Sequence, residues 1–318
     1  MSAKIFTQRE DMNTPKEPIT GEEVLNAFKA DIESFFGSNN AFQLRVEVGG
    51  ISPVCRGSGE KARIIWPKDL LTQPVNTSND MVFLLIVLGH ETAHYLNRHN
   101  EHNDQSSFES RAIEMWADFF GTKVALVAIT IGEKLQRLSV ALPDWDNSGK
   151  RIDALASALA TLSATYFKIE HQKYPPARVR VATCVAGALS FFEVLFSIQA
   201  GAKGGYEGYL KASHPDTIVR RALEIQMRIY RNEVLNNLVI IPEPLDLNSE
   251  QLQTISAVHK GIQAGQRAMF CGMAPIPAAW LNLNYDVPEE QRQETVKNKM
   301  QVLKNTLERL GIDPSSVA

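Results

Sequence analysis

An uninterrupted apolar run, Met81 to Leu88, leads directly into a polar stretch that reads GHETAHYLNRHN. Three residues of the types that cap helices, Ser78, Asn79 and Asp80, precede the run. A capped apolar run of this kind is typical of a helix start. The pattern therefore predicts one helix that continues through the polar stretch.

Capping residues and the spacing of apolar positions also predict the helices and strands in the rest of the chain. A capping box at Thr20 and Glu23 opens an amphipathic helix that ends at Gly37. Apolar and polar residues alternate from Phe42 to Val48, which is the period of a half-buried strand, and a second β-prone run covers Ala62 to Trp66. After a turn-rich connection at residues 143–150, helices are expected at residues 152–169, 177–200, 220–240, 249–270 and 288–311.

The polar stretch contains His90, Glu91 and His94 in the pattern H-E-x-x-H. Residues four apart lie on one face of a helix, so both imidazoles can occupy corners of a metal tetrahedron. Glu91 lies one residue further round and can reach a water at the open metal position without ligating the metal. The alternative is a pair of surface histidines on an amphipathic helix.

A catalytic zinc needs a third protein ligand. A metzincin-type site would need Gly at position 97 and His at position 100, but the chain has Asn97 and Asn100. This excludes the metzincin pattern. His99 and His102 fall in a polar segment, whose composition predicts solvated loop residues rather than ligands.

The next predicted helix supplies other candidates. It opens with a capping box at Ser106 to Glu109 and carries the sequence EMWAD from Glu114 to Asp118. Glu114 follows His94 by twenty residues, and Asp118 lies one turn further along the same face. Taken alone, two acidic residues four apart are typical of an ordinary charged helix face.

With both motifs present, the sequence resembles the gluzincin metallopeptidases, whose second motif is a Glu ligand followed four residues later by Asp. The Glu-x-x-Ala-Asp form is similar to that of Ste24/HtpX-like peptidases, Lit-like phage-exclusion peptidases and ImmA/IrrE-like regulators. The resemblance implies that His90, His94 and Glu114 bind Zn²⁺. It also implies that Glu91 is the general base and that Asp118 fixes the tautomer of a ligating histidine.

The helical and strand periods along the chain predict an α+β, mainly α-helical fold. To this the resemblance adds a zincin-like metallopeptidase core with a small β-sheet beside the metal helix. The edge strand of such a sheet pairs with extended substrate, and Ala62 to Trp66 is our candidate for that edge. A core hairpin is the alternative. We expect a flexible tail at residues 1–19, a catalytic domain at residues 20–240 and a C-terminal helical extension at residues 241–318.

Two later segments share one spacing, in which Pro follows a ring donor and Arg comes six residues after the donor. They run from Tyr174 to Arg180 and from His214 to Arg220. In Ste24/HtpX-like peptidases a His-Pro-Pro segment of this spacing lies near the metal, but here the Pro-Pro copy has Tyr and the His copy lacks the second Pro. Tyr174 and His214 are both catalytic candidates for stabilising an oxyanion. The alternative for each is a helix start with Pro in its first turn.

Composition narrows the possible classes. The chain has 318 residues and a net charge of −3, which gives no electrostatic footprint for nucleic acid. Three isolated cysteines indicate free thiols in a reducing compartment, and residues 1–18 lack an apolar core, so we expect a cytoplasmic protein without a secretory signal. Residues 181–202 are long enough to cross a bilayer, but Glu193 and Gln199 favour a buried core helix and no membrane span.

The sequence therefore predicts a soluble zinc-dependent metalloendopeptidase that acts on a protein or peptide substrate. One alternative is a regulatory or defence module that has a metallopeptidase fold and cleaves or binds one partner only when triggered. The other is a structural protein stabilised by metal. The presence of Glu91 disfavours the latter, since a structural site needs no base and closes with a fourth protein ligand.

Overall fold

The structure is a computed structural model of the chain. It describes residues 18–36, 42–101, 107–145, 148–168 and 173–239, together with Met273, Pro277, Trp280 and Leu281. In chain order the elements are β1 (Ile19–Thr20), α1 (Gly21–Ser34), β2 (Val46–Val48), β3 (Val54–Arg56), η1 (Gly59–Lys61), β4 (Arg63–Trp66), α2 (Lys68–Thr72), β5 (Pro74–Val75), α3 (Ser78–Leu96), η2 (His99–Glu101), α4 (Ser107–Ile131), α5 (Glu133–Ser139), α6 (Ser148–Ala164), α7 (Ala177–Ala212), α8 (Pro215–Ile229) and α9 (Glu233–Val239).

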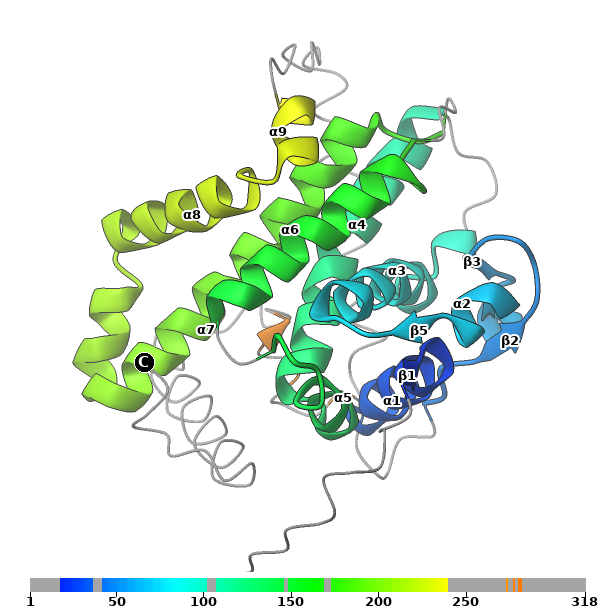
Figure 1. Cartoon of the computed structure of the whole chain (residues 1–318), viewed down its shortest axis with the longest axis horizontal. Helices are drawn as coiled ribbons and strands as arrows, with labels where there is room; N and C mark the ends of the chain where they lie inside the picture. The colour runs from blue at the N-terminus through cyan, green and yellow to red at the C-terminus, as the bar shows by residue number, and fades with distance from the viewer. Residues whose placement is uncertain are drawn as a thin grey trace, which may run out of the picture.

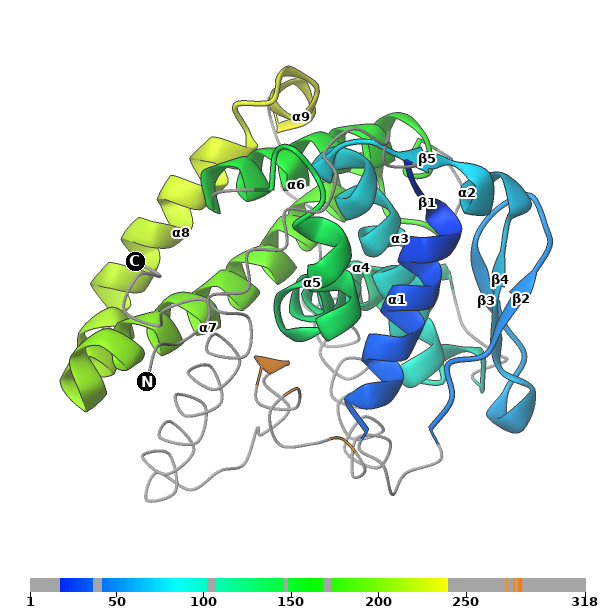
Figure 2. The same cartoon turned by 60° about the horizontal axis from the view of Figure 1, so that its bottom comes forward.

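The described part of the chain is mainly helical and has two small sheets, which confirms the predicted α+β class. One sheet pairs β1 with β5, and the other has the strand order β2-β4-β3. Figures 1 and 2 show α1, α2 and the strands towards one end of the molecule and α8 at the opposite end. Helices α3 and α4 lie between them.

Helix α3 lies in the middle of the hydrophobic core. Every residue from Met81 to Leu88 is buried, because α3 packs against α1, α4 and α6. Its N-terminus is capped by Thr77, whose hydroxyl accepts from the Asp80 N–H while the Asp80 carboxylate accepts from the Thr77 N–H. The capping residue thus precedes the three polar residues expected from the sequence. Ser78 is held instead by Asp144, whose carboxylate accepts from the Ser78 N–H at 2.9 Å.

Helices α3 and α4 cross at a pair of glycines. A Cβ atom on Gly89 would lie 2.2 Å from the carbonyl oxygen of Gly121, and a Cβ atom on Gly121 would lie 2.6 Å from the Cα atom of His90. Residues without a side chain allow two backbones to approach this closely. The contact therefore holds the backbone at His90 directly against α4.

The three-stranded sheet corrects the prediction for Ala62 to Trp66. Most of this segment forms β4, which pairs in parallel with β2 and antiparallel with β3, so it is the central strand and not an edge. The strand predicted from Phe42 to Val48 is also shorter than expected, with Val46–Val48 in the sheet. Alternation identifies a strand but does not say which neighbours it pairs with. The edge strand β3 lies against α3.

The helices of the second half differ from the prediction in their limits. Helix α7 continues to Ala212 through a kink at Gly205, whose φ is 63°. Helix α8 begins at Pro215 rather than at Arg220, because Pro in the first turn has a helical φ and needs no hydrogen-bond acceptor. The helix expected up to residue 240 is divided between α8 and α9.

Among the described residues, α7 is the single helix that is long and apolar enough to cross a membrane. The bent pair α4 and α5, at 79° to each other, meets the same criteria if it is counted as one span. Half of the most apolar 18-residue window of α7 is buried, and this helix packs against α4, α6 and α8. The expected lack of a membrane span stays a prediction.

Several predicted segments lie outside the described residues. They are the tail before residue 18, the capping-box side chains at residues 106–109, His102, and the helices at residues 249–270 and 288–311.

The described residues of the predicted C-terminal extension pack against helices of the predicted catalytic domain. Trp280 is 1% exposed, and its ring stacks on Phe191 of α7 at a centroid distance of 5.8 Å. The Nζ of Lys123, on α4, donates a hydrogen bond of 3.1 Å to the carbonyl oxygen of Leu281. At this point the extension is thus continuous with the hydrophobic core.

The glycine contact predicts that Gly89→Ala and Gly121→Ala each destabilise the fold. The added methyl group overlaps the backbone of the facing helix, so we expect the free energy of unfolding in urea to fall by roughly 1–3 kcal/mol. Gly204→Ala in α7 is the control, because its Cβ atom would meet nothing within 4 Å. Alanine there should be neutral or stabilising by up to about 1 kcal/mol. Equal stability of all three variants would contradict the close crossing.

Candidate metal centre

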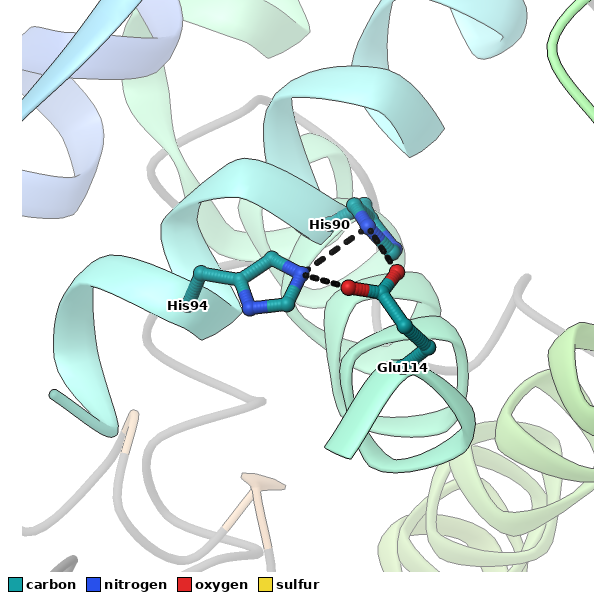
Figure 3. Close-up of side chains that lie close together, drawn as sticks. All are labelled: His90, His94 and Glu114. Carbon is teal, nitrogen blue, oxygen red and sulfur yellow. Dashed lines mark hydrogen bonds and ion pairs between the residues drawn. The ribbon is translucent and has the colours of Figure 1, made fainter. Parts of the chain in front are cut away.

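Three side chains from α3 and α4 converge on one point (Figure 3). His90 and His94 lie one turn apart on α3, and Glu114 faces them from α4. The Nε2 atom of His90 lies 3.1 Å from Nε2 of His94 and 3.4 Å from Oε2 of Glu114. The Nε2 atom of His94 lies 3.5 Å from Oε1 of Glu114. This group could hold a metal ion.

The spacing of these atoms is compatible with one bound metal ion. Bonds of about 2.0–2.1 Å at tetrahedral angles place neighbouring ligand atoms about 3.3 Å apart. The two Nε2 atoms are 3.1 Å apart, and they lie 3.4 and 3.5 Å from different oxygens of Glu114. Two imidazole lone pairs at such a distance repel each other unless a proton or a cation lies between them. The Oε2 atom of Glu114 is also buried without a hydrogen bond in the described part of the chain. Nη2 of Arg180 lies 3.7 Å from this oxygen, which is beyond hydrogen-bond distance, so a metal ion would satisfy it.

Asp118 and Arg180 orient His90. The Nδ1 atom of His90 lies 2.8 Å from Oδ1 of Asp118, so a neutral His90 carries its proton on Nδ1 and turns the lone pair of Nε2 towards Glu114. Arg180, in the first turn of α7, donates from Nε and Nη2 to both oxygens of Asp118, at 2.8 and 2.9 Å. Metal-binding histidines commonly donate their second nitrogen to a carboxylate in this way.

Charges within the cluster shift several pKa values. Burial disfavours the positive charge on His90, but the carboxylates of Asp118 and Glu114 outweigh burial and raise the pKa of His90 to about 10. Burial also opposes ionisation of Glu114, yet His94 and His90 hold the pKa of Glu114 well below its usual range. Burial alone would raise the pKa of Asp118, but Arg180 and His90 lower it. Both carboxylates therefore stay ionised at neutral pH and attract positive charge, which a proton or a metal ion can supply.

The side chain of Glu91, on α3, contacts strand β3 of the three-stranded sheet. Its buried carboxylate accepts a hydrogen bond of 2.6 Å from the Cys55 N–H of β3. The Cys55 carbonyl accepts from Nδ2 of Asn100 at 3.0 Å. In an antiparallel strand both main-chain groups of one residue point to the same side. The edge of β3 that is not paired with β4 therefore faces α3 and Glu91.

The expectation of a solvated loop is wrong for His99. This residue is 4% exposed, and its Nδ1 atom lies 2.7 Å from Nδ1 of His94. The reason is the backbone at Arg98, whose φ of 52° ends α3 with a left-handed turn. A polar composition indicates an exposed loop but carries no sign of such a turn.

Tyr174 lies near the group formed by His90, His94 and Glu114. Burial raises its pKa, and the carboxylates of Glu114 and Glu91 raise it further. The Arg180 guanidinium lies 5.6 Å from the centre of the Tyr174 ring. The Tyr-Pro-Pro copy of the repeated spacing therefore contributes both its ring and its arginine to this region.

The structure does not bring His214 to the metal group. His214 is the N-cap of α8, and its side chain is 62% exposed. Between Arg180 and the kink at Gly205, α7 spans about 38 Å at 1.5 Å per residue. Figures 1 and 2 accordingly show the turn between α7 and α8 at the end of α7 that is far from α3. The cap explains the His-Pro pair without a role in catalysis.

Three residues complete the centre without having been predicted from the sequence to belong to it. Arg180 had one signal, its position six residues after Tyr174. His99 had another, since it follows His94 by five residues and lies just past the helix end. Cys55 donates its backbone N–H to Glu91, and the type of a side chain gives no sign of such a main-chain contact.

Comparisons with protein-family models, curated proteins and solved structures find no match to this chain. The resemblance to gluzincins therefore stays an expectation carried by the motif residues.

The buried pair of Asp118 and Arg180 predicts an unequal cost for two similar substitutions. Arg180→Met removes from the buried Asp118 the guanidinium that holds both of its oxygens and leaves His90 as a remaining partner, so the free energy of unfolding of the metal-free protein should fall by roughly 3–5 kcal/mol. Arg228→Met breaks an equally bidentate pair with Asp153 whose side chains are 40% and 55% exposed. Its cost should be below about 1 kcal/mol. Similar losses for both variants in urea denaturation with a chelator would contradict the prediction.

Proposed function

We propose that the protein is a zinc-dependent metallopeptidase that hydrolyses peptide bonds of a protein substrate. The observation that carries the proposal is the convergence of two imidazoles and one carboxylate, whose ligand atoms lie within 4.8 Å of one another, next to Glu91 on the same helix. Within the described residues three protein groups converge, which supports an open fourth position. Catalytic zinc sites keep that position open, whereas structural sites close it with a protein ligand.

Each residue of the centre has a role in this proposal. Zn²⁺ held by His90, His94 and Glu114 would act as a Lewis acid that acidifies water and polarises the scissile carbonyl. Glu91 takes the proton of the attacking water and passes it to the leaving amine. The Cys55 N–H holds Oε2 of Glu91, which limits the orientations of the base.

Tyr174 is the candidate oxyanion donor. Its pKa is raised by burial and by the neighbouring carboxylates, so its hydroxyl is protonated at neutral pH and can donate to a developing negative charge. The guanidinium of Arg180 lies over its ring and restricts its motion. The side chain is 39% exposed, which leaves it accessible to a substrate.

The free edge of β3 is the candidate for substrate alignment. This edge faces Glu91, and Asn100 now donates to the Cys55 carbonyl there. An extended peptide that adds to β3 would replace Asn100 with its own main-chain N–H. We therefore assign to β3 the substrate-pairing role first expected for Ala62 to Trp66.

Glu91→Gln should keep the zinc and lose hydrolysis. The amide oxygen can still accept from the Cys55 N–H, but an amide cannot take a proton, so kcat should fall at least about 100-fold. Zinc content and cleavage of unfolded casein measure the two effects. Glu224→Gln on the exposed face of α8 is the control. Undiminished cleavage by Glu91→Gln would refute the assignment of the base.

The same assay separates a general peptidase from the triggered alternative. A general peptidase cleaves unfolded casein, whereas a regulatory or defence module would bind zinc and leave casein intact. A proteomic comparison of cells that hold the parent chain or Glu91→Gln would then reveal one processed partner. No processed protein and no casein cleavage by a zinc-loaded chain would argue against peptidase function.

Glu114→Gln should weaken zinc binding. The substitution replaces an anionic ligand with a neutral amide, so the loss should exceed the 10–100-fold that is typical for residues that merely orient a ligand. Dialysis against a chelator, followed by zinc analysis, measures this retention. Unchanged zinc content would count against Glu114 as the third ligand.

A further inference from the structure

The second candidate ligand, His94, is itself held by a histidine. The Nδ1 atoms of His99 and His94 lie 2.7 Å apart, and the two rings meet at 82° with their centroids 4.8 Å apart. His99 is buried, although it lies in the 3-10 turn η2 beyond the end of α3. The contact uses Nδ1 of His94, whereas Nε2 faces Glu114, so His99 does not compete for the metal position.

A strained turn places His99 against His94. Helix α3 ends at Leu96, its C-cap Asn97 donates from Nδ2 back to the Ala93 carbonyl, and Arg98 then has a φ of 52°. For a residue with a side chain, this left-handed conformation costs roughly 1–2 kcal/mol. Such strain persists where the surrounding contacts maintain it, and it is concentrated at functional sites. Here its result is that the chain turns back and His99 reaches the ring of His94, two residues before the end of α3.

We propose that His99 is a positioning residue that fixes the tautomer and ring orientation of His94, as Asp118 does for His90. The inference rests on the proposed metal site. A neutral His94 that ligates through Nε2 carries its proton on Nδ1, and this N–H donates to the lone pair on Nδ1 of His99. His99 accordingly carries its own proton on Nε2.

The two candidate ligands are thus supported by different chemistry. Asp118 places a negative charge beside His90, and Arg180 compensates it. His99 offers a neutral acceptor and adds no charge. Glu91, Glu114 and Asp118 already bring three carboxylates to this part of the core, so a further buried carboxylate without a partner would be costly. An imidazole orients His94 without that cost.

The tautomers can be measured on the unmodified chain. Long-range ¹H–¹⁵N correlation spectra of the zinc-loaded protein with labelled histidines report which ring nitrogen carries the proton. We expect Nδ1–H for His94 and Nε2–H for His99. A proton on Nδ1 of His99 would overturn the proposal, because two N–H groups cannot share the 2.7 Å contact.

Two variants separate the hydrogen bond from packing. His99→Phe keeps a buried ring but removes the acceptor, so zinc affinity should fall about 10–100-fold and the visible absorption bands of the Co²⁺-loaded protein should shift. His99→Gln restores an acceptor oxygen and should recover most of both properties. His214→Phe makes the same chemical change at an exposed position outside the site and is the matched control. Competition with a chromophoric chelator gives the affinities.

The outcomes distinguish this inference from the proposed function. If His99→Phe binds zinc as tightly as the parent chain and gives the same Co²⁺ spectrum, the positioning role is overturned while the metal site stays intact. Equal weakening in His99→Phe and His99→Gln would also overturn it, since loss of packing alone would then account for the effect. A parent chain that binds neither ion would overturn the proposed function and this inference together.

Discussion

The candidate centre depends on how closely α3 and α4 approach each other. Gly89 and Gly121 bring the two backbones into contact, one residue from His90, and the buried run from Met81 to Leu88 fixes α3 within the core. Because the contact is between main chains, the distance from His90 and His94 to Glu114 is set by the helices themselves. Rotation of these side chains then needs to change that distance little. A site built on two rigid helices holds its groups more precisely than one built on loops.

A second constraint is electrostatic. Glu114 and Asp118 are ionised although they are buried, and Arg180 together with His90 supplies the compensating positive charge. Arg180 reaches the centre from α7, across 62 residues of sequence, so α7 belongs to the site as much as the two motif helices do. A divalent metal ion that replaces the proton on Nε2 of His90 would add one net positive charge, which the carboxylates of Glu114 and Asp118 favour.

The sequence predicts the parts of the centre that follow from helical periodicity. His90, His94, Glu114 and Asp118 are each four residues from a partner on one helix, so their common faces could be recognised without a structure. The mainly helical class follows from the same patterns, and the structure confirms it.

Features that depend on tertiary contact could not be predicted in this way. Alternation marks β4 as a strand but gives no sign that it is central, and a backbone N–H such as that of Cys55 has no signature in residue type. His99 depends on a left-handed φ at Arg98, a residue type that rarely adopts it. Tyr174 and His214 share one spacing, and the contact between Arg180 and Asp118 is what distinguishes their segments.

The packing of Trp280 and Leu281 bears on how the protein can be divided for study. A fragment that stopped at the end of α9 would uncover the Phe191 ring on α7 and remove a main-chain acceptor from Lys123 on α4. Both helices carry groups of the centre, Arg180 on one and Glu114 on the other. Inactivity of such a truncated chain would therefore report damage to the scaffold as readily as loss of a separate C-terminal task.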